Sequence, residues 1–235
     1  MIDVFIPCYN SAATIEVTIS SVLAAGYNPI VLDNFSADST KLKAREMGAK
    51  VLVFPDHHKN RVESWNRFFT HQHAGNFDFS RILFAGDTIK SEEVDAVQRF
   101  ISAKSGEFAI IRKYDELNAL GLHFTEHSHL NDIYEISYKE IRRATLSGIN
   151  IFGGPSNYLF RKSYLLRDNI RFCPWLEWAA DWHFGNVLTK KTMCVHLINR
   201  TSAINEDERQ TLERLRSTAR ARIETKIIQG YVWSR

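Results

Sequence analysis

The first 112 residues alternate between two kinds of segment, and this alternation limits the fold more than any other feature of the sequence. Short apolar runs rich in β-branched residues, each bounded by turn residues, are typical of buried strands. They lie at 2–7, 30–33, 50–54, 81–85 and 108–112. The stretches between them have helical spacing, at 15–23, 38–48, 61–73 and 91–104. This order predicts an α/β fold with a mostly parallel sheet and right-handed crossovers.

The pattern is less regular after residue 112. We expect a long excursion with a helix at 138–146, followed by an apolar run at 158–160, a helix near 177–189 and a strand near 193–198. Residues 205–230 have the pattern of one amphipathic helix, whose predicted apolar side consists of Leu212, Leu215, Ala219, Ile223 and Ile227.

Composition and charge argue against a disordered tail and give no support for a nucleic-acid partner. The chain has 235 residues, with 30 Lys and Arg against 27 Asp and Glu, and 44% of its residues are hydrophobic. It is too apolar for a disordered tail. A net charge of +3 with a pI of 8.7 gives no support for a nucleic-acid partner. Much of the excess is local to the last helix, in Arg214, Arg216, Arg220, Arg222 and Lys226.

The basic C-terminal helix has two interpretations. It docks on the domain with its charges matched to the helix dipole, or it contacts an anionic membrane or a lipid-linked acceptor. No run approaches the roughly 18 apolar residues of a membrane span, and the start at Met1 lacks a basic leader region. We therefore expect a cytoplasmic protein, peripheral at most to the inner face of the membrane. Three widely spaced cysteines, Cys8, Cys173 and Cys194, predict reduced thiols.

In parallel α/β sheets, ligands bind outside the carboxyl ends of the strands. No glycine-rich dinucleotide or P-loop motif follows the first strand. The charge of a bound phosphate would therefore have to be neutralised in another way. A metal ion held by carboxylates is the usual alternative. Asp33 ends the second predicted strand, and Asp87 follows the fourth. Either could instead cap a turn, as could Asp38.

Three segments of the first 90 residues carry recognisable motifs. The first strand ends in Ile6-Pro7-Cys8-Tyr9-Asn10, and the second runs into Asp33-Asn34-Phe35-Ser36-Ala37-Asp38-Ser39-Thr40. The third helix carries Asn66 near its middle. Together these segments resemble glycosyltransferase family 2, which has a GT-A fold. The resemblance is strong over about residues 2–90 and looser to about 202.

The resemblance implies a donor site. Pro7, Tyr9, Asn10, Asp33 and Asn66 would bind the nucleotide of a nucleotide-diphospho-sugar, with UDP expected. In the same comparison, Asp87 would hold Mn²⁺ or Mg²⁺, and His196 is a weaker candidate for the family's late metal-site histidine. The first acid of the metal motif is replaced by Ala85, so catalysis without a bound metal is also open.

The resemblance also implies an acceptor side. Gly153 and Gly154 match a glycine-containing acceptor segment, and Asp181-Trp182 matches an acid followed by an aromatic residue. Asp181 would be the general base of an inverting transfer, although an acid at the start of a helix is an alternative interpretation. The tryptophans Trp175, Trp178 and Trp182 are spaced as a core stripe. His123, His127 and His129 are expected in a solvated loop rather than at a metal.

These expectations combine into one hypothesis. A GT-A domain over 1–204 comprises a nucleotide-sugar-binding half, 1–112, and an acceptor-side half, 113–204, and the C-terminal basic helix occupies 205–235. The chain would be a hexosyltransferase-type enzyme of polysaccharide biosynthesis, using a glycan or lipid-linked saccharide as acceptor. The alternative is an inactive nucleotide-sugar-binding module, since Ala85 and Ala180 replace acids. A nucleotidyltransferase is a weaker alternative because it would need a phosphate loop.

Overall fold

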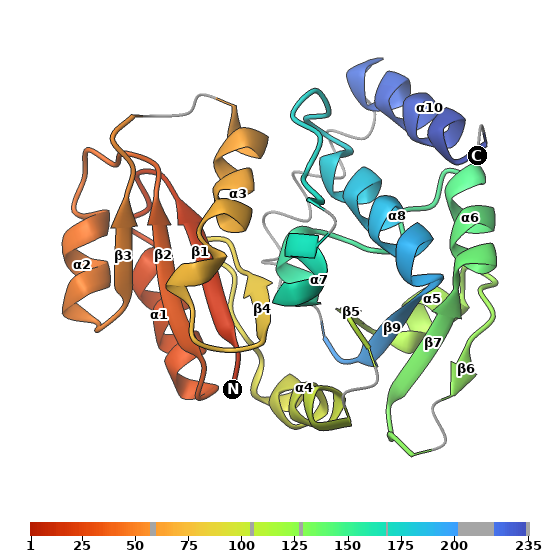
Figure 1. Ribbon diagram of the computed structural model, residues 1–235, viewed down its shortest axis with the longest axis horizontal. Coiled ribbons are helices and arrows are strands. Elements are labelled where there is room, and N and C mark those ends of the chain that lie inside the picture. Colours follow the sequence, from red (N-terminus) through yellow and green to blue (C-terminus); the bar gives the residue numbers. More distant parts are fainter. Residues whose placement is uncertain (57–59, 104–105, 127–128, 168, 202–218, 234–235) are drawn as a thin grey trace.

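One sheet of nine described strands runs through the molecule. The computed structural model describes residues 1–56, 60–103, 106–126, 129–167, 169–201 and 219–233. Along the sheet the strands lie in the order β3-β2-β1-β4-β8-β5-β9-β7-β6. Figure 1 labels these strands except β8. The strands are β1 Asp3–Cys8, β2 Asn28–Asp33, β3 Lys50–Val53, β4 Phe79–Ile82, β5 Phe108–Arg112, β6 Thr125–Glu126, β7 Ile133–Ser137, β8 Tyr158–Arg161 and β9 Cys194–Asn199.

The predicted parallel order is confirmed, with one interruption at the centre. β3, β2, β1 and β4 are parallel, and β5 is parallel to β9. β8 lies antiparallel between β4 and β5, and it joins the two halves of the sheet. At the far end β7 pairs antiparallel with β9 and with β6. The first half of the chain therefore forms a parallel sheet with helical crossovers. β8 runs in the opposite direction beside β4 and connects this sheet to β5.

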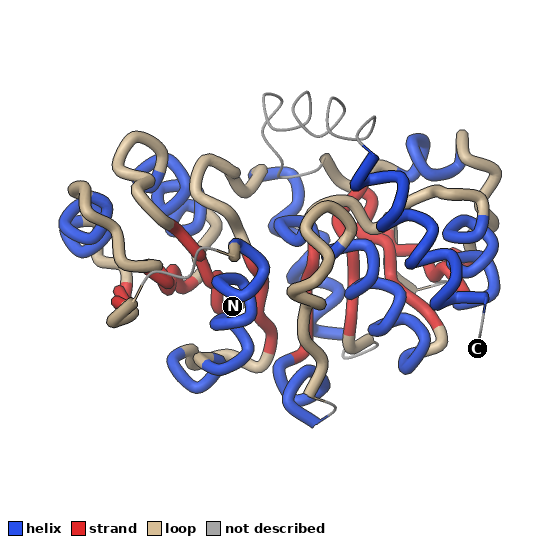
Figure 2. Tube along the Cα trace, turned by 90° about the horizontal axis from the view of Figure 1, so that it is seen from above, coloured by secondary structure: helices blue, strands red, loops and turns tan. Residues whose placement is uncertain are grey.

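Helices cover both faces of the sheet, as the view from above also shows (Figure 2). One core cluster contains buried residues of α1, α2 and α4, and the other contains buried residues of α3, α6, α7, α8 and α10. The helices are α1 Ile15–Ala24, α2 Thr40–Glu46, α3 Arg61–Thr70, α4 Ser91–Ala103, α5 Tyr114–Asn118, α6 Tyr138–Leu146, α7 Lys162–Arg167, α8 Ala180–Thr192 and α10 Ala219–Trp233, with short 3₁₀ turns η1 Gln72–Ala74 and η2 Pro155–Asn157. Among the described residues, none of the helices combines the length and the apolar character that crossing a bilayer requires.

The core of the second half is built from stacked aromatic rings. The rings of Phe172 and Phe184 are stacked with centroids 4.2 Å apart, and Phe108 stacks on Phe160 at 5.6 Å. Aromatic pairs add specific geometry to the burial of large apolar areas. The packing fixes α8 and the segment before it against the sheet.

The C-terminal helix docks on the domain, but with a different face from the one predicted. α10 packs against α6 and α8, and its buried residues are Ala221, Glu224, Ile228 and Val232 (Figure 1). The predicted stripe is wrong for Ile223 and Ile227, which are 60% and 51% exposed. Its remaining members lie outside the described residues or, for Ala219, at the margin where only the backbone is described. The helix also continues to Trp233, past residue 230 where the predicted helix ends.

Candidate functional site

The loops after β1 and β2 are joined by hydrogen bonds. The Asn10 backbone N–H donates to Ser36 Oγ at 2.9 Å, and Asn10 Oδ1 accepts from the Ala37 N–H at 2.9 Å. Asp38 Oδ2 accepts from the Ala12 N–H at 3.0 Å. Asn10 has a left-handed φ of 48°, a conformation that asparagine tolerates. The Asn10 side chain therefore orders the two loops on which a donor site would be built.

Asp33 lies at the end of β2, beside Cys8 at the end of β1. Its carboxylate is fully buried: Oδ2 accepts from the Ser36 N–H at 3.0 Å, and Oδ1 accepts from the Cys8 thiol at 3.8 Å. Burial, together with the charge of Asp33, raises the pKa of the Cys8 thiol well above its usual range. Pro7 is buried within β1, whereas Tyr9 is 46% exposed beyond the strand end.

Asp87 follows β4 and lies at the same carboxyl edge of the sheet. Asp87 is 2% exposed, and one of its carboxylate oxygens accepts a short hydrogen bond from the hydroxyl of Ser156. The same hydroxyl accepts from the Phe84 N–H at 3.2 Å, and the Ser156 carbonyl accepts from Arg81 Nε at 2.7 Å. Arg81 is completely buried and paired with the equally buried Glu93 of α4. Ser156 thus connects the β4 end to the start of β8.

Asp181 lies in the first turn of α8, close to the same edge. The Tyr158 hydroxyl, at the start of β8, donates to the carbonyls of Gly153 at 3.0 Å and of Asp181 at 3.2 Å. Burial raises the pKa of the Asp181 carboxyl to about 6, although hydrogen bonds from the Trp182 backbone and from Asn150, and the charge of Arg61, act in the opposite direction. A carboxylate with this pKa is mostly ionised at pH 7 and can still accept a proton.

The two candidate acceptor-side glycines form the turn that precedes β8. Gly153 has a φ of +69°, and a Cβ there would lie 3.0 Å from Asn157 Nδ2. The Gly154 carbonyl accepts from the Asn157 N–H at 3.0 Å and begins η2. A left-handed, closely approached position favours glycine. The turn carries Ser156 into contact with Asp87.

Helix α3 holds the segment that leads to Asp181. Asn66 Nδ2 donates to the Phe172 carbonyl at 2.9 Å, and Asn66 Oδ1 accepts from the Phe172 N–H at 2.9 Å. Asn60 caps α3 and donates to the Pro174 carbonyl at 3.0 Å. The Asn66 amide, predicted to bind nucleotide, is thus occupied at both ends by the protein backbone. The next residue, Trp175, is 85% exposed, so only part of the predicted tryptophan stripe lies in the core.

Glu224 of α10 anchors the turn in front of α8. Its carboxylate accepts from three consecutive backbone N–H groups, those of Glu177 at 3.1 Å and of Trp178 and Ala179 at 2.8 Å. Arg220 Nε donates to the same carboxylate at 3.0 Å. A negative charge is favourable at a helix N-terminus, where backbone N–H groups lack helical partners. The C-terminal helix therefore holds the turn that leads directly into the helix that carries Asp181.

Two predicted site residues lie elsewhere. His196 is on β9, three strands from β4 in the sheet order, which is about 14 Å at the usual strand spacing. It cannot share an ion with Asp87, so its assignment to that metal site is wrong. Trp182 is 1% exposed, and its indole Nε1 donates to Thr145 Oγ1 at 3.4 Å. It packs in the core between α6 and α8 rather than facing an acceptor. His123 is exposed in the segment just before β6, and His127 lies outside the described residues.

At this edge, Asp87 is the acid that the sequence predicts as a metal ligand. Ala85 offers no ligand, and Asp87 offers a carboxylate that Ser156 already contacts. Mg²⁺ is commonly held by one or two carboxylates together with substrate phosphates. Asp87 would fit that lower limit if a substrate phosphate supplied further ligands.

An open hollow lies farther along the same edge, past the ends of β5 and β9. It has a volume of about 560 Å³ and is lined by Glu92, Lys113, Asp115, Asn199, Arg200 and Thr201. Arg200 is held there by the Glu92 carbonyl at 2.7 Å and by Asp132 at 2.9 Å. The hollow is thus bordered by both signs of charge.

Residues 3–73 match the model of the family described as Glycosyl transferase family 2. The resemblance seen in the sequence is confirmed. The matched segment contains the interlocked loops after β1 and β2 and the whole of α3. The search of curated proteins gave no match.

Solved structures share the fold at low sequence identity. S. aureus TarS aligns with a TM-score of 0.60 and 18% identity over 91% of this chain, and this chain spans 38% of TarS. Glucosyl-3-phosphoglycerate synthase from Mycobacterium tuberculosis, in complex with UDP, aligns with a TM-score of 0.56 and 16% identity, covering 91% of this chain and 76% of that one. The mannosyltransferase PcManGT from Pyrobaculum calidifontis, in complex with GDP-Man and Mn²⁺, gives 0.56 and 15%, covering 87% and 57%. The GT-A architecture of the chain is thereby established.

Sequence reasoning missed the residues that hold the site together. The contacts that hold the site together join segments more than 40 residues apart, and they are made by Ser156, Arg81 and Glu224. Local sequence patterns do not predict such contacts. A buried arginine within a strand was the one available signal, because such a charge needs a partner.

The Glu224 anchor predicts a specific loss of stability. Replacing Glu224 with Gln removes the charge from a turn of three N–H donors and should lower the free energy of unfolding by about 1–3 kcal/mol. Glu177→Gln is the matched control, since Glu177 pairs with the same Arg220 in an exposed bridge and should change stability little. Chemical denaturation at pH 7 measures both; equal effects of the two variants would contradict the anchoring role.

The same anchor should contribute to acid sensitivity. Burial alone would raise the pKa of Glu224, but hydrogen bonds from the Ala179 N–H, from Arg220 and from the neighbouring N–H groups lower it below its usual 4.5. A lowered folded-state pKa means that the stabilisation is complete above about pH 4.5 and is lost as pH falls toward the folded value. The Glu224→Gln variant should lack this component of the acid-induced loss.

Proposed function

We propose that this chain is a glycosyltransferase that moves a sugar from a nucleotide diphosphate, with UDP the best candidate, to a hydroxyl of a glycan or lipid-linked acceptor. The observation that carries the proposal is the joint placement of three acids along one sheet edge: Asp33 at the end of β2, Asp87 after β4, and Asp181 beside the start of β8. The family match over residues 3–73 supports the same general activity.

The donor half would bind the nucleotide in the interlocked loops. The exposed ring of Tyr9 could stack on the nucleotide base. The carboxylate of Asp33 could accept a hydrogen bond from an N–H group of the base once the Ser36 N–H, which now donates to it, moves aside. Asp87 would hold Mn²⁺ or Mg²⁺ together with the donor diphosphate. When bound, that ion supplies positive charge next to the leaving group.

Asp181 would act as the general base of an inverting transfer. Its carboxylate takes the proton of the acceptor hydroxyl while the hydroxyl oxygen attacks the anomeric carbon, and the bond between that carbon and the diphosphate oxygen breaks. Asn150 and the backbone N–H groups orient the carboxylate. The exposed Trp175, attached to α3 through Pro174, offers an aromatic surface for an acceptor sugar.

The outer face of α10 would bring the enzyme to its acceptor at the inner face of a membrane. Ile223 and Ile227 are exposed at helical spacing, and the exposed Arg222 and Lys226 lie beside them. Apolar residues flanked by cations suit an anionic lipid surface. A role in polysaccharide assembly would follow from such a location.

The base assignment predicts the effect of one substitution. Asp181→Asn should lower kcat by about 10²- to 10⁴-fold, the usual contribution of general base catalysis. Activity of the unsubstituted enzyme should rise with pH through about 6, because the base works only when ionised. The measurement is sugar transfer or donor hydrolysis over a panel of UDP-, GDP- and dTDP-sugars.

Asp78→Asn is the control for that substitution, since Asp78 pairs with Arg161 in a half-exposed bridge at the opposite strand ends. It should retain normal activity. Full activity of Asp181→Asn on the correct donor would contradict the base assignment. UDP binding without turnover of any donor would favour the alternative, an inactive nucleotide-sugar-binding module.

Membrane contact is tested with vesicles. The unsubstituted protein should sediment together with phosphatidylserine vesicles and should stay in the supernatant with phosphatidylcholine vesicles. The double variant Ile223→Ser/Ile227→Ser should bind the anionic vesicles at least about tenfold more weakly, because it loses most of the apolar area of the contact. Unchanged binding by the double variant would remove α10 from the proposed membrane contact.

A further inference from the structure

Three side chains with metal-binding atoms meet across the β7–β9 pair. Glu135 of β7 lies directly opposite His196 of β9, and Cys194 is two residues before His196 on the same strand face. A carboxylate oxygen, the cysteine sulfur and an imidazole nitrogen all lie within 4.8 Å of one another. His196 Nε2 is 4.0 Å from Glu135 Oε2, and the Cys194 thiol is hydrogen-bonded to Glu135.

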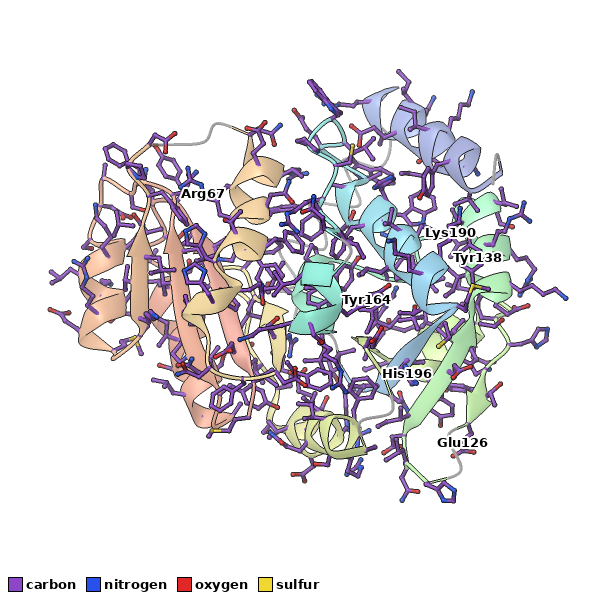
Figure 3. The ribbon with its side chains drawn as sticks, viewed as in Figure 1. Arg67, Glu126, Tyr138, Tyr164, Lys190 and His196 are labelled. Carbon is purple, nitrogen blue, oxygen red and sulfur yellow. The ribbon has the colours of Figure 1, made fainter. Side chains whose placement is uncertain are left out.

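The imidazole of His196 is buried and closely surrounded by neighbouring residues. Its side chain is 5% exposed, its ring lies 5.3 Å from that of Phe100 in α4, and a Cβ at Gly106 would come within 2.7 Å of its Cε1 and Nδ1 atoms. Figure 3 labels His196 on β9, next to β7. In contrast, Glu135 is 41% exposed and Cys194 is partly exposed. The cluster therefore has one fixed ligand and two that solvent can reach.

This cluster is separate from the candidate active site. His196 pairs with Ala109, the second residue of β5, so the cluster lies toward the amino ends of the parallel strands. Asp87 lies beyond the carboxyl end of β4, three strands away. A metal ion in the cluster would not contact a donor diphosphate at Asp87.

We propose that Glu135, Cys194 and His196 bind a zinc ion that ties β7 to the start of β9. Sulfur and imidazole ligands favour Zn²⁺ over Mg²⁺ or Mn²⁺, which prefer oxygen. Tetrahedral bonds of about 2.0–2.3 Å put ligand atoms about 3.5 Å apart, a contraction that rotation of the half-exposed Glu135 and Cys194 side chains can supply. Water takes the fourth position. Binding replaces the S–H bond of Cys194 with an S–Zn bond and releases one proton to solvent.

Cobalt is the probe, because a Co²⁺–thiolate bond gives a charge-transfer absorption that an oxygen site such as Asp87 does not. Titration of the full, reduced, metal-stripped chain with Co²⁺ should produce this band with one equivalent, and Zn²⁺ should abolish it. Cys194→Ser should remove the band. The matched control Cys173→Ser removes another partly buried thiol and should leave it intact.

Glu135→Gln provides a second variant at a half-exposed position where folding is not at risk. It should weaken Co²⁺ binding at least about tenfold, since even outer partners of a metal site contribute this much. The absence of a thiolate band, its survival in Cys194→Ser, or unchanged affinity in Glu135→Gln would each overturn the proposal.

Discussion

The contact between Ser156 and Asp87 is the interaction on which the arrangement of the site depends. β8 runs antiparallel between two sets of parallel strands, so the turn that begins it arrives at the edge where the parallel strands end. The Ser156 carbonyl accepts from the buried Arg81, while its hydroxyl donates to Asp87. A buried arginine without these partners would be strongly destabilising. Because Arg81 pairs with Glu93 and also donates to the Ser156 carbonyl, it links β4 and α4 to the turn that begins β8.

A second constraint acts from the C-terminus. Glu224 brings a full negative charge to three N–H donors in front of α8, and α8 begins one residue later with Asp181 in its first turn. The chain end is therefore part of the structure that positions the candidate base. The same helix keeps Ile223 and Ile227 outward, so docking and surface contact use different faces of α10.

The sequence predicted what local patterns encode. The β-α alternation gave β1 through β5 and their helices to within a few residues, and the helix at 138–146 is α6 itself. The placement of β8 between β4 and β5 depends on long-range pairing, which periodicity does not contain. The predicted apolar face of α10 is wrong at Ile223 and Ile227 because the face that docks contains the buried Glu224. A hydrophobic pattern assigns a glutamate to the exposed side.

The predicted site residues also differ in how well the sequence could place them. Asp33, Asp87 and Asp181 lie at one sheet edge, because strand ends are readable from sequence. His196 and Trp182 were assigned from the resemblance to the family, but β9 lies three strands from β4 and Trp182 is buried in the core. Asn66 has the expected place on α3, where its amide binds the Phe172 backbone.

Calorimetric titration with UDP in the presence of Mn²⁺ tests the central claim most directly, namely that this sheet edge is a nucleotide-diphosphate site. The unsubstituted chain should bind UDP, and Asp33→Asn should bind it at least about tenfold more weakly, the equivalent of one lost hydrogen bond to a charged group. Asp78→Asn should bind normally. Failure of the unsubstituted chain to bind UDP or GDP, or full affinity in Asp33→Asn, would contradict the account.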